Sequence, residues 1–293
     1  MKRELSILIP TYNSDCRQQV AVLSRQAEAT EGLEYEIIVA DDGSTDRHYA
    51  RLCGEVAALP HCRFIDRGVN SGRAAIRNFL AREARYRWLL FMDAGMTVVS
   101  DCYLLNYLEA DFHDVAYGGY AVGTGERGNL RYIYEIACAP EHRAAERRKR
   151  PFMHFHTSNF VVRRDIMLAH PFDERFRRYG YEDVLWGKRL KAECVSVVHP
   201  DNPVGFCMFE SNARFVSKTE EALCTLHLFR DDLRGYSKLI TFVEGIHLMP
   251  VRWVIGLWHR LLGPLERRNL CGSRPSLLLF KLYKLGYYLS LKD

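Results

Sequence analysis

The stretch RWLLFMDAGM, residues 87–96, decides the fold of this chain. Its apolar part, residues 88–92, has the length and composition of a buried strand, and it leads directly into a carboxylate, Asp93. In an open α/β sheet, ligands bind outside the carboxyl ends of the strands. Asp93 is therefore placed for chemistry, whereas Gly95 offers no second side chain beside it.

Short β-rich runs of this kind alternate with helix-length polar segments through the first 118 residues. The predicted strands are 5–9, 35–40, 63–66, 88–92 and 114–117, and the predicted helices are 15–30, 45–59, 71–86 and 101–110. Strict alternation of this length is typical of a mostly parallel, doubly wound sheet flanked by helices. The chain is therefore expected to belong to the α/β class.

The second half follows a different pattern. Residues 120–150 lose the alternation and end in the basic run HRAAERRKR, which predicts a mobile exposed segment. Beyond it, residues 154–164 and 194–198 are predicted strands, and 182–191 and 210–233 are predicted helices. From residue 236 the chain becomes basic and aromatic, with amphipathic helices. We expect a domain over residues 1–235, with halves 1–118 and 119–235, and a helical tail over 236–293.

Composition excludes several classes of protein. With 48% hydrophobic and 26% charged residues in 293, the chain can bury a large core and is not disordered. Nine scattered cysteines without a CxxC pair argue against a disulfide framework or a zinc site, and favour reduced thiols in the cytoplasm. Residues 246–293 hold eight Lys or Arg against two acids, so this region carries +6 and the rest −1. Basic residues break every apolar run short of the ~18 residues that a membrane span needs.

Other strand ends also carry polar motifs. The first predicted strand ends in IPTYN, residues 9–13, and the second in ADDGSTD, residues 40–46. Asp41 and Asp42 suit hydrogen bonds to a base and a ribose, although for this motif taken alone an Asx turn with Ser44 or Thr45 capping the next helix is the favoured interpretation. In NSGRAAIRN, residues 70–78, a glycine is followed by two arginines four residues apart, which suits a diphosphate. Neither G-x-G-x-x-G nor a P-loop is present.

Taken together, IPTYN, ADDGSTD, NSGRAAIRN and FMDAG resemble the inverting family 2 glycosyltransferases of bacterial polysaccharide synthesis, which have a GT-A nucleotide-sugar fold. The segments NFVVRRDIM, FDERFRRYGYEDVLWGKRL and DNPVGFCMFESNARFVSKTEEAL extend this resemblance to about residues 5–230. It implies a nucleotide-binding half over 1–118 and an acceptor-binding half over 119–235. The implied donor is a nucleotide-sugar, with UDP favoured, and the implied acceptor is a glycan or a lipid-linked saccharide in surface polysaccharide synthesis.

The resemblance also assigns roles to residues. Asp183 is the expected general base that takes the acceptor proton, and Glu182 is expected to bind the acceptor. An ordinary acidic first turn, balanced by Lys188 and Arg189, is the structural alternative. The residues expected around the nucleotide-sugar are Pro10, Tyr12, Asp41, Asp42, Gly72, Arg73 and Asp93. Trp186, His156 and His199 are candidates for contact with the acceptor or the diphosphate, with core packing as the alternative for Trp186 and His199.

The chain departs from the family where a divalent metal, Mn²⁺ or Mg²⁺, is usually bound. The family has a second Asp where this chain has Gly95, and a further ligand, usually His, aligns with Phe206. Only Asp93 remains as a metal ligand, so a metal cofactor is doubtful. Three interpretations stay open: arginines replace the metal, His154 and His156 on one strand face rebuild a site, or the chain is a non-catalytic binding subunit. Candidate arginines are Arg73, Arg77, Arg163, Arg164 and those of the 142–150 run.

The tail has two interpretations as well. Its aromatic faces could pack on the preceding domain, or its basic and aromatic residues could lie on the anionic cytoplasmic face of a membrane. We favour the membrane, and with it a cytoplasmic protein peripheral to the inner face of the cell membrane. Nucleic acid is not an expected partner, because the basic residues are mixed with apolar ones and no binding module is recognised.

Overall fold

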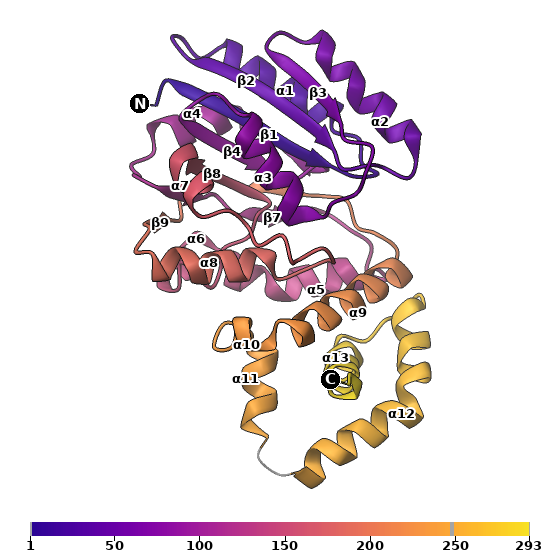
Figure 1. Ribbon diagram of the computed structural model, residues 1–293. Helices are drawn as coiled ribbons and strands as arrows, with labels where there is room; N and C mark the ends of the chain where they lie inside the picture. Colours follow the sequence, from indigo (N-terminus) through magenta and orange to yellow (C-terminus); the bar gives the residue numbers. More distant parts are fainter. Residues whose placement is uncertain (1, 247–248, 293) are drawn as a thin grey trace. The chain divides into compact units, whose positions relative to one another are not determined.

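The computed structural model describes residues 2–246 and 249–292, which divide into two compact units. Unit 1 comprises residues 1–123, 140–177 and 182–207, and unit 2 comprises residues 124–139, 178–181 and 208–293. Unit 1 is the α/β part, and unit 2 is helical (Figure 1). The nine cysteines are free thiols. Among the described residues, no helix combines the length and the apolar character required to cross a membrane.

Unit 1 is built on a seven-stranded sheet with the order β3-β2-β1-β4-β8-β6-β9. Its strands are β1 Glu4–Thr11, β2 Glu34–Asp41, β3 Cys62–Asp66, β4 Trp88–Met92, β6 Val115–Tyr117, β8 Asn159–Arg163 and β9 Val197–Val198. The first four strands run parallel, as predicted, and so do β6 and β9. Strand β8 runs antiparallel to both of its neighbours. The sheet is therefore mixed but mostly parallel, as the sequence predicted.

Helices cover both faces of this sheet. The helices of unit 1 are α1 Arg17–Glu28, α2 Arg47–Gly54, α3 Arg73–Glu83, α4 Tyr103–Glu109, α6 Ala144–Lys149, α7 Arg164–Ala169 and α8 Glu182–Ala192. Alternate residues of β1 face opposite ways, so Ile7 packs with α1 and α4 in one core, and Leu8 packs with α3 and α8 in the other. A small second sheet, β5-β10-β7, contains Met96–Thr97, Val204–Phe206 and Tyr120–Val122.

Unit 2 is a helical assembly that includes the predicted tail. Its helices are α5 Leu130–Cys138, α9 Asn212–Leu228, α10 Arg230–Leu233, α11 Lys238–Gly245, α12 Met249–Cys271 and α13 Leu277–Ser290. Phe280 and Tyr283 of α13 pack with Leu130 of α5 and Phe215 of α9 in one apolar core. Helix α12 continues through Pro264. The tail boundary at residue 236 stays a prediction.

The expectation for residues 120–150 is corrected in part: most of the basic run 142–150 is exposed, but the segment has regular secondary structure and Arg147 is buried. This segment forms β7, α5, a 3₁₀ turn over Ala139–His142, and α6. Arg147, in the middle of the basic run, is buried and donates hydrogen bonds to the carbonyl oxygens of Gly118 (2.9 Å) and Pro200 (3.0 Å). The basic composition predicts that Arg147 is exposed. The sequence does not reveal the carbonyl oxygens that accept hydrogen bonds from its guanidinium group and so allow its burial.

Two predicted strands are also shorter than expected. Residues 154–158 are not in a strand, and β8 begins only at Asn159. His154 and His156 therefore do not share a strand face, which removes the geometric basis for a metal site rebuilt from them. The strand predicted over 194–198 contains only Val197 and Val198, because Cys194 has a positive φ of 56° and ends the turn that follows α8.

Candidate functional site

The carboxyl ends of β1, β2 and β4 lie at one edge of the sheet because these strands are parallel. Asp41 is the last residue of β2, Asp93 follows β4, and Tyr12 follows β1. Pro10 pairs with Ala40 in the β1–β2 register, one step before this edge. The parallel topology therefore brings together predicted residues that are far apart in the sequence.

Asp41 and Asp42 hold the loops at this edge. The Asp41 carboxylate accepts hydrogen bonds from the backbone N–H of Ser44 (2.8 Å) and from its hydroxyl, which is the Asx-type turn that the sequence allowed. Neither Ser44 nor Thr45 caps α2, since the cap is Asp46, which accepts from His48 N at 3.0 Å. The carboxylates of Asp41 and Asp42 are both buried.

Asp42 anchors the loop that precedes α3. It accepts from the backbone N–H groups of Ser71 (3.1 Å) and Gly72 (2.9 Å) and from Arg67 (2.9 Å). The oxygens expected to face a nucleotide are thus already engaged by the protein. Tyr12 is the exposed member of this group, with 39% of its surface accessible, and its role beside the nucleotide stays a prediction.

Gly72 is required by two separate constraints at the start of α3. Its φ is +91°, a conformation that residues with a side chain rarely adopt. A Cβ atom here would also lie 3.0 Å from the backbone oxygen of Arg177. The backbone of residue 177 therefore lies against the start of α3, and the proposed role of Gly72 beside a diphosphate stays a prediction.

A buried arginine connects the strand-end carboxylate to the acidic pair. Arg77 is 1% exposed and lies 2.5 Å from Asp93 and 3.3 Å from Glu182, measured between nitrogen and oxygen. Arg73, which is 45% exposed, approaches the same two carboxylates at 3.9 Å. Two cations and two anions form one cluster, so each buried charge has an opposite partner. Burial and the neighbouring Asp183 raise the pKa of Glu182.

Asp183 lies in the first turn of α8 beside His156. The His156 Nδ1 atom is 3.2 Å from an Asp183 oxygen, and the other oxygen accepts from Val184 N at 2.8 Å. Burial favours the neutral acid, but the hydrogen bond and charge of His156, the N–H of Val184 and the charge of Arg77 together outweigh it, so the pKa of Asp183 is lowered. Asp183 is therefore ionised at neutral pH, as a general base must be. His156 joins the cluster that the sequence assigned to the acceptor.

Two other predicted contacts are wrong because both side chains lie in the core. Trp186 packs against Phe172 with ring centroids 4.7 Å apart and donates from Nε1 to the His170 carbonyl at 2.7 Å. His199 is buried, with Nδ1 accepting from Arg147 (3.2 Å) and Nε2 directed at the Pro151 carbonyl (3.0 Å). Each polar atom is satisfied inside the protein, so neither side chain is available to a substrate.

Arg163 and Arg164 are not placed to replace the metal, because both are engaged elsewhere. Arg163 pairs with Asp165 and with Asp114, at 2.5 and 3.3 Å, at the end of β8 remote from Asp93. Arg164 donates to the Arg82 carbonyl at 3.3 Å. Among the arginines suggested by the sequence, the geometry places Arg73 and Arg77 in the cluster.

Sequence reasoning missed Asn159, which organises the base of the site. Its side-chain amide donates to the carbonyls of Gly119 (2.7 Å) and Asn202 (2.9 Å), and its oxygen accepts from Tyr107 at 2.8 Å. The preceding residue, Ser158, accepts from the backbone N–H of Asp93 at 3.1 Å. An asparagine at the start of an apolar run was the available signal, because a buried amide needs several partners.

The residues at the expected metal position do not fit a divalent cation. Met96 pairs with Phe206, so the two family ligand positions, Gly95 and Phe206, are close together, yet neither has a donor atom in its side chain. The one carboxylate present, Asp93, is bound by Arg77. Within residues 2–246 and 249–292, no group of three His, Cys, Asp or Glu side chains could hold a metal ion.

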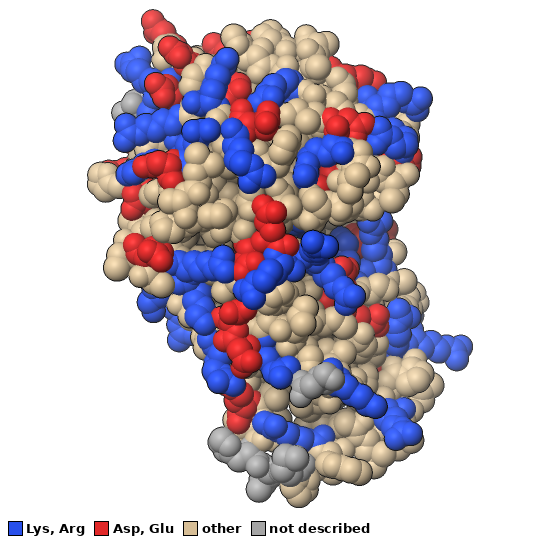
Figure 2. Space-filling view, viewed as in Figure 1, with Lys and Arg blue, Asp and Glu red and all other residues tan. Residues whose placement is uncertain are grey.

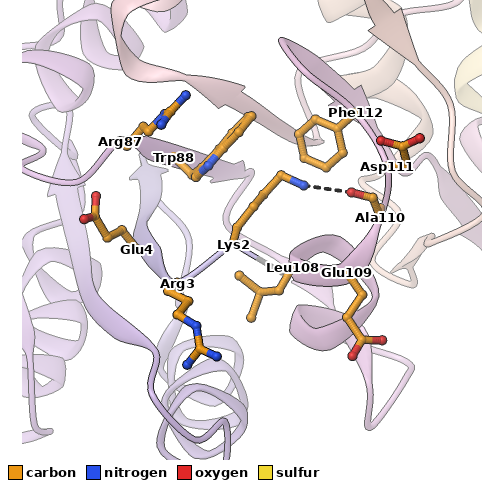
Figure 3. Close-up of a pocket in the computed structure, with 10 residues that line it drawn as sticks. All are labelled: Lys2, Arg3, Glu4, Arg87, Trp88, Leu108, Glu109, Ala110, Asp111 and Phe112. Carbon is orange, nitrogen blue, oxygen red and sulfur yellow. Dashed lines mark hydrogen bonds between the residues drawn. The ribbon is translucent and has the colours of Figure 1, made fainter.

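A separate cavity lies at the opposite end of the sheet, at the amino ends of the strands. It has a volume of about 510 Å³ and is lined by residues at the start of β1, at the start of β4 and after α4 (Figure 3). Lys2 crosses it, donating to the Ala110 carbonyl at 2.7 Å above the ring of Phe112. Because it lies at the amino ends of the strands, it is not part of the predicted site.

Comparisons with solved structures agree with this fold. A mannosyltransferase of Pyrobaculum calidifontis, solved with GDP-Man and Mn²⁺, matches with a TM-score of 0.55 at 14% identity, over 99% of this chain and 85% of that one. TarS 1–349 of S. aureus, solved with UDP-GlcNAc, matches with a TM-score of 0.53 at 16% identity, over 99% and 89%. At these identities the likeness concerns the fold alone, which is the GT-A fold.

Sequence comparisons give several glycosyltransferases as relatives, among them the following two. The validoxylamine A glucosyltransferase of Streptomyces hygroscopicus subsp. limoneus is 28% identical over 225 residues, 64% of this chain and 48% of the relative. An uncharacterized glycosyltransferase of Haemophilus influenzae is 26% identical over 131 residues, 44% of this chain and 52% of that protein. The chain spans about half the length of these curated relatives.

A family model provides the assignment. The model described as glycosyl transferase family 2 matches residues 6–169, more than half of the chain, and covers β1 to α7 with Asp41, Asp42, Gly72, Arg77 and Asp93. The match and the GT-A fold agree with the family that the sequence motifs indicated. So does the strand-end cluster, which consists of Arg73, Arg77, Asp93 and Glu182. The chain belongs to glycosyl transferase family 2.

Proposed function

We propose that this chain is an inverting glycosyltransferase that moves a sugar from a UDP-sugar to a glycan or lipid-linked acceptor in surface polysaccharide synthesis. The observation that carries the proposal is the Arg77 link between Asp93 and Glu182, which joins the strand-end edge to the acidic pair. UDP and GDP sugars are bound by the structural neighbours named above. UDP is favoured here by the motifs of the first half.

The proposed step uses residues of the chain alone. The acceptor hydroxyl attacks the anomeric carbon from the face opposite the nucleotide, and its proton passes to Asp183. The bond between the anomeric carbon and the phosphate oxygen breaks, so the nucleoside diphosphate leaves with the electron pair. His156 holds the carboxylate of Asp183 in its charged form. Arg73, partly exposed beside Asp93, supplies positive charge where negative charge develops.

Glu182 is assigned a positioning role in this proposal. It is 3% exposed and directed at Arg77, so it fixes the guanidinium against Asp93. The sequence prediction that it binds the acceptor stays a prediction.

The test separates an enzyme from a non-catalytic binding subunit. Purified chain is titrated with UDP and GDP, and the release of nucleotide from a panel of UDP and GDP sugars is measured with an acceptor mixture. In Asp183→Asn, release should fall by about 10²–10⁴-fold, the range typical for loss of a general base, while UDP affinity stays unchanged. Lys188→Gln, on the same helix, is the matched control. UDP binding without turnover for any donor would favour the binding subunit.

We also propose that the tail attaches to the anionic cytoplasmic face of a membrane. Seven large apolar residues of α12 are exposed, among them Trp253 at 74%. They are Val251, Trp253, Val254, Leu257, Trp258, Leu261 and Leu265. The same helix carries Arg252, Arg260, Arg267 and Arg268. Figure 2 shows basic side chains interspersed with uncharged ones on the visible face of unit 2. Apolar burial plus about 1 kcal/mol per basic residue at an anionic surface supports peripheral attachment.

Vesicle co-sedimentation tests this attachment. The chain should bind vesicles rich in phosphatidylglycerol, and less so neutral vesicles or anionic ones in high salt. Trp253→Ser combined with Leu261→Ser should remove most binding, whereas Val99→Ser, an exposed apolar position in unit 1, should not. If the wild type instead forms a dimer in gel filtration and ignores vesicles, the face joins two copies of the chain and the membrane proposal fails.

A further inference from the structure

A second pocket lies within unit 2, separate from the residues of the strand-end cluster. It is formed by α5, α9, α13 and the loop 178–181, and its volume is about 150 Å³. At roughly 30 Å³ per water, this is room for about five waters. Pockets for larger ligands usually start near 300 Å³, so the size suits a small ligand, such as one sugar ring that carries a phosphate, rather than a nucleotide.

The pocket combines aromatic walls with positive charge. Tyrosines 134, 179 and 181 and phenylalanines 215 and 280 contribute rings, and three cations line the same space. Arg131 pairs with Glu135 at 2.7 Å, and Lys218 pairs with Glu210 at 3.1 Å. Lys284, the third cation, has no carboxylate within ion-pair distance in the part of the chain that the structure describes.

Lys284 is the strongest indication of a ligand. Its ammonium lies 5.0 Å from the ring centre of Tyr134 and 4.8 Å from that of Phe280, and the side chain is half-buried. Burial, together with the charge of Lys281, lowers the pKa of Lys284. The faces of aromatic rings stabilise a cation much less than a neighbouring anion does. The positive charge of Lys284 is therefore only weakly compensated by the protein itself.

The loop over residues 178–181, which lines the pocket, is held in a strained backbone conformation. The Tyr179 N–H donates to Glu221 at 3.1 Å, and the Tyr179 carbonyl accepts from Thr225 at 3.0 Å, both on α9. Gly180 has a φ of +99°, and Tyr181 has a φ of +69°, which is unfavourable for a residue with a side chain. Backbone strain that is fixed by tertiary hydrogen bonds is typical of ligand sites.

We propose that this pocket binds a phosphorylated sugar, with the phosphate at Lys284 and the sugar ring against the aromatic walls. Ammonium and guanidinium groups are the natural partners of phosphate oxygens. Tyrosine rings offer an apolar face to the C–H side of a sugar and a hydroxyl to its edge. The inference rests on the proposed function in one respect: the ligand is then the phosphate-bearing part of the acceptor, whether free or attached to a lipid.

Calorimetric titration of the full chain tests the proposal. UDP is present at saturation so that the donor site is filled, and the probes are glucose 1-phosphate, inorganic phosphate and glucose. Glucose 1-phosphate should bind more tightly than either half alone. Lys284→Met should weaken it about tenfold or more, because the variant loses a hydrogen bond between two charged groups. Lys284→Arg should keep most of the affinity.

Lys281→Met is the matched control, because Lys281 is exposed on the same helix. It should leave the affinity for glucose 1-phosphate unchanged, and thermal unfolding should show that all three variants are folded. Equal affinity in wild type and Lys284→Met, or no saturable binding of glucose 1-phosphate to the wild type, overturns the proposal. Affinity for UDP is measured in the same preparations, and its absence counts against the proposed transferase activity instead. An undecaprenyl phosphate analogue in detergent, compared with glucose 1-phosphate, distinguishes a lipid-linked source from a free one.

Discussion

The contact between His156 and Asp183 determines when the proposed base is charged. His156 lowers the pKa of Asp183 through a hydrogen bond and through its charge. Removing the imidazole should raise that pKa, so protonation of the base should set in at a higher pH.

His156→Asn should therefore shift the acid limb of the pH–rate profile upward, with less change in kcat at the alkaline side of that limb. Nucleotide release is measured as a function of pH for the variant and for His48→Asn, an exposed histidine on α2. Coincident acid limbs in wild type and His156→Asn would show that His156 does not tune the base.

The glycine at position 95 leads to a second prediction at the scale of single residues, which concerns the dependence of UDP affinity on Mn²⁺. Since the residues around Asp93 do not form a divalent-cation site, the affinity for UDP should change by less than about threefold between Mn²⁺ and EDTA. In Gly95→Asp, a second carboxylate stands near Asp93, and UDP affinity should come to depend on Mn²⁺. The φ of +86° at residue 95 disfavours Asp less than most side chains, and a Cβ there meets only Ser14 Oγ, at 3.4 Å.

Calorimetry with UDP measures both chains, and Gly95→Asn is the control because it tolerates the same backbone without adding a charge. Loss of UDP binding to the wild type on adding EDTA is the result that contradicts this prediction.

At the scale of elements, the link between α6 and the segment after β9 should make stability depend on pH. Burial lowers the pKa of His199 to about 4, from a usual 6.5. The unfolded chain therefore binds a proton between these values while the folded chain does not, so stability is complete above pH 6.5 and is lost as the pH falls toward 4. At 1.36 kcal/mol per pKa unit, this group contributes about 3 kcal/mol to the loss.

Urea unfolding at several pH values between about 7 and 4 measures this dependence. The free energy of unfolding of His199→Asn should be lower at neutral pH but should fall less steeply than that of the wild type, whereas His113→Asn, an exposed position, should keep the wild-type slope. Parallel curves for wild type and His199→Asn would contradict the assignment.

The elements also show how far sequence reasoning reaches. Apolar runs such as residues 5–9 and 88–92 identify β1 and β4 because each strand is buried on both faces of the sheet. The basic run at 142–150 did not reveal that Arg147 is buried. Its burial depends on the carbonyl oxygens of residues 118 and 200, which are distant in the sequence. Trp186 and His199 failed for a related reason, since a motif position does not reveal which way a side chain points.

At the scale of the whole molecule, the helices after residue 235 contribute side chains to the core of unit 2. Phe280 and Tyr283 are buried against Leu130 and Phe215, and burial of one such side chain contributes about 1.5–3 kcal/mol. A chain that ends at Gly235 should expose this core, bind a hydrophobic dye and aggregate. Its solubility and dye fluorescence are compared with those of a chain that ends at Ser290, which retains α13. A soluble, dye-silent chain ending at Gly235 would contradict this view and support an independent tail.

The antiparallel strand β8 has a consequence for synthesis of the chain. Strand β4, which is buried along its whole length, has β8 as its neighbour on one side, and β8 begins 67 residues after β4 ends, at Asn159 after Met92. Until the ribosome has released that segment, an apolar strand edge stands open, and such edges pair with other chains. The growing polypeptide therefore passes through an aggregation-prone interval in the middle of its translation.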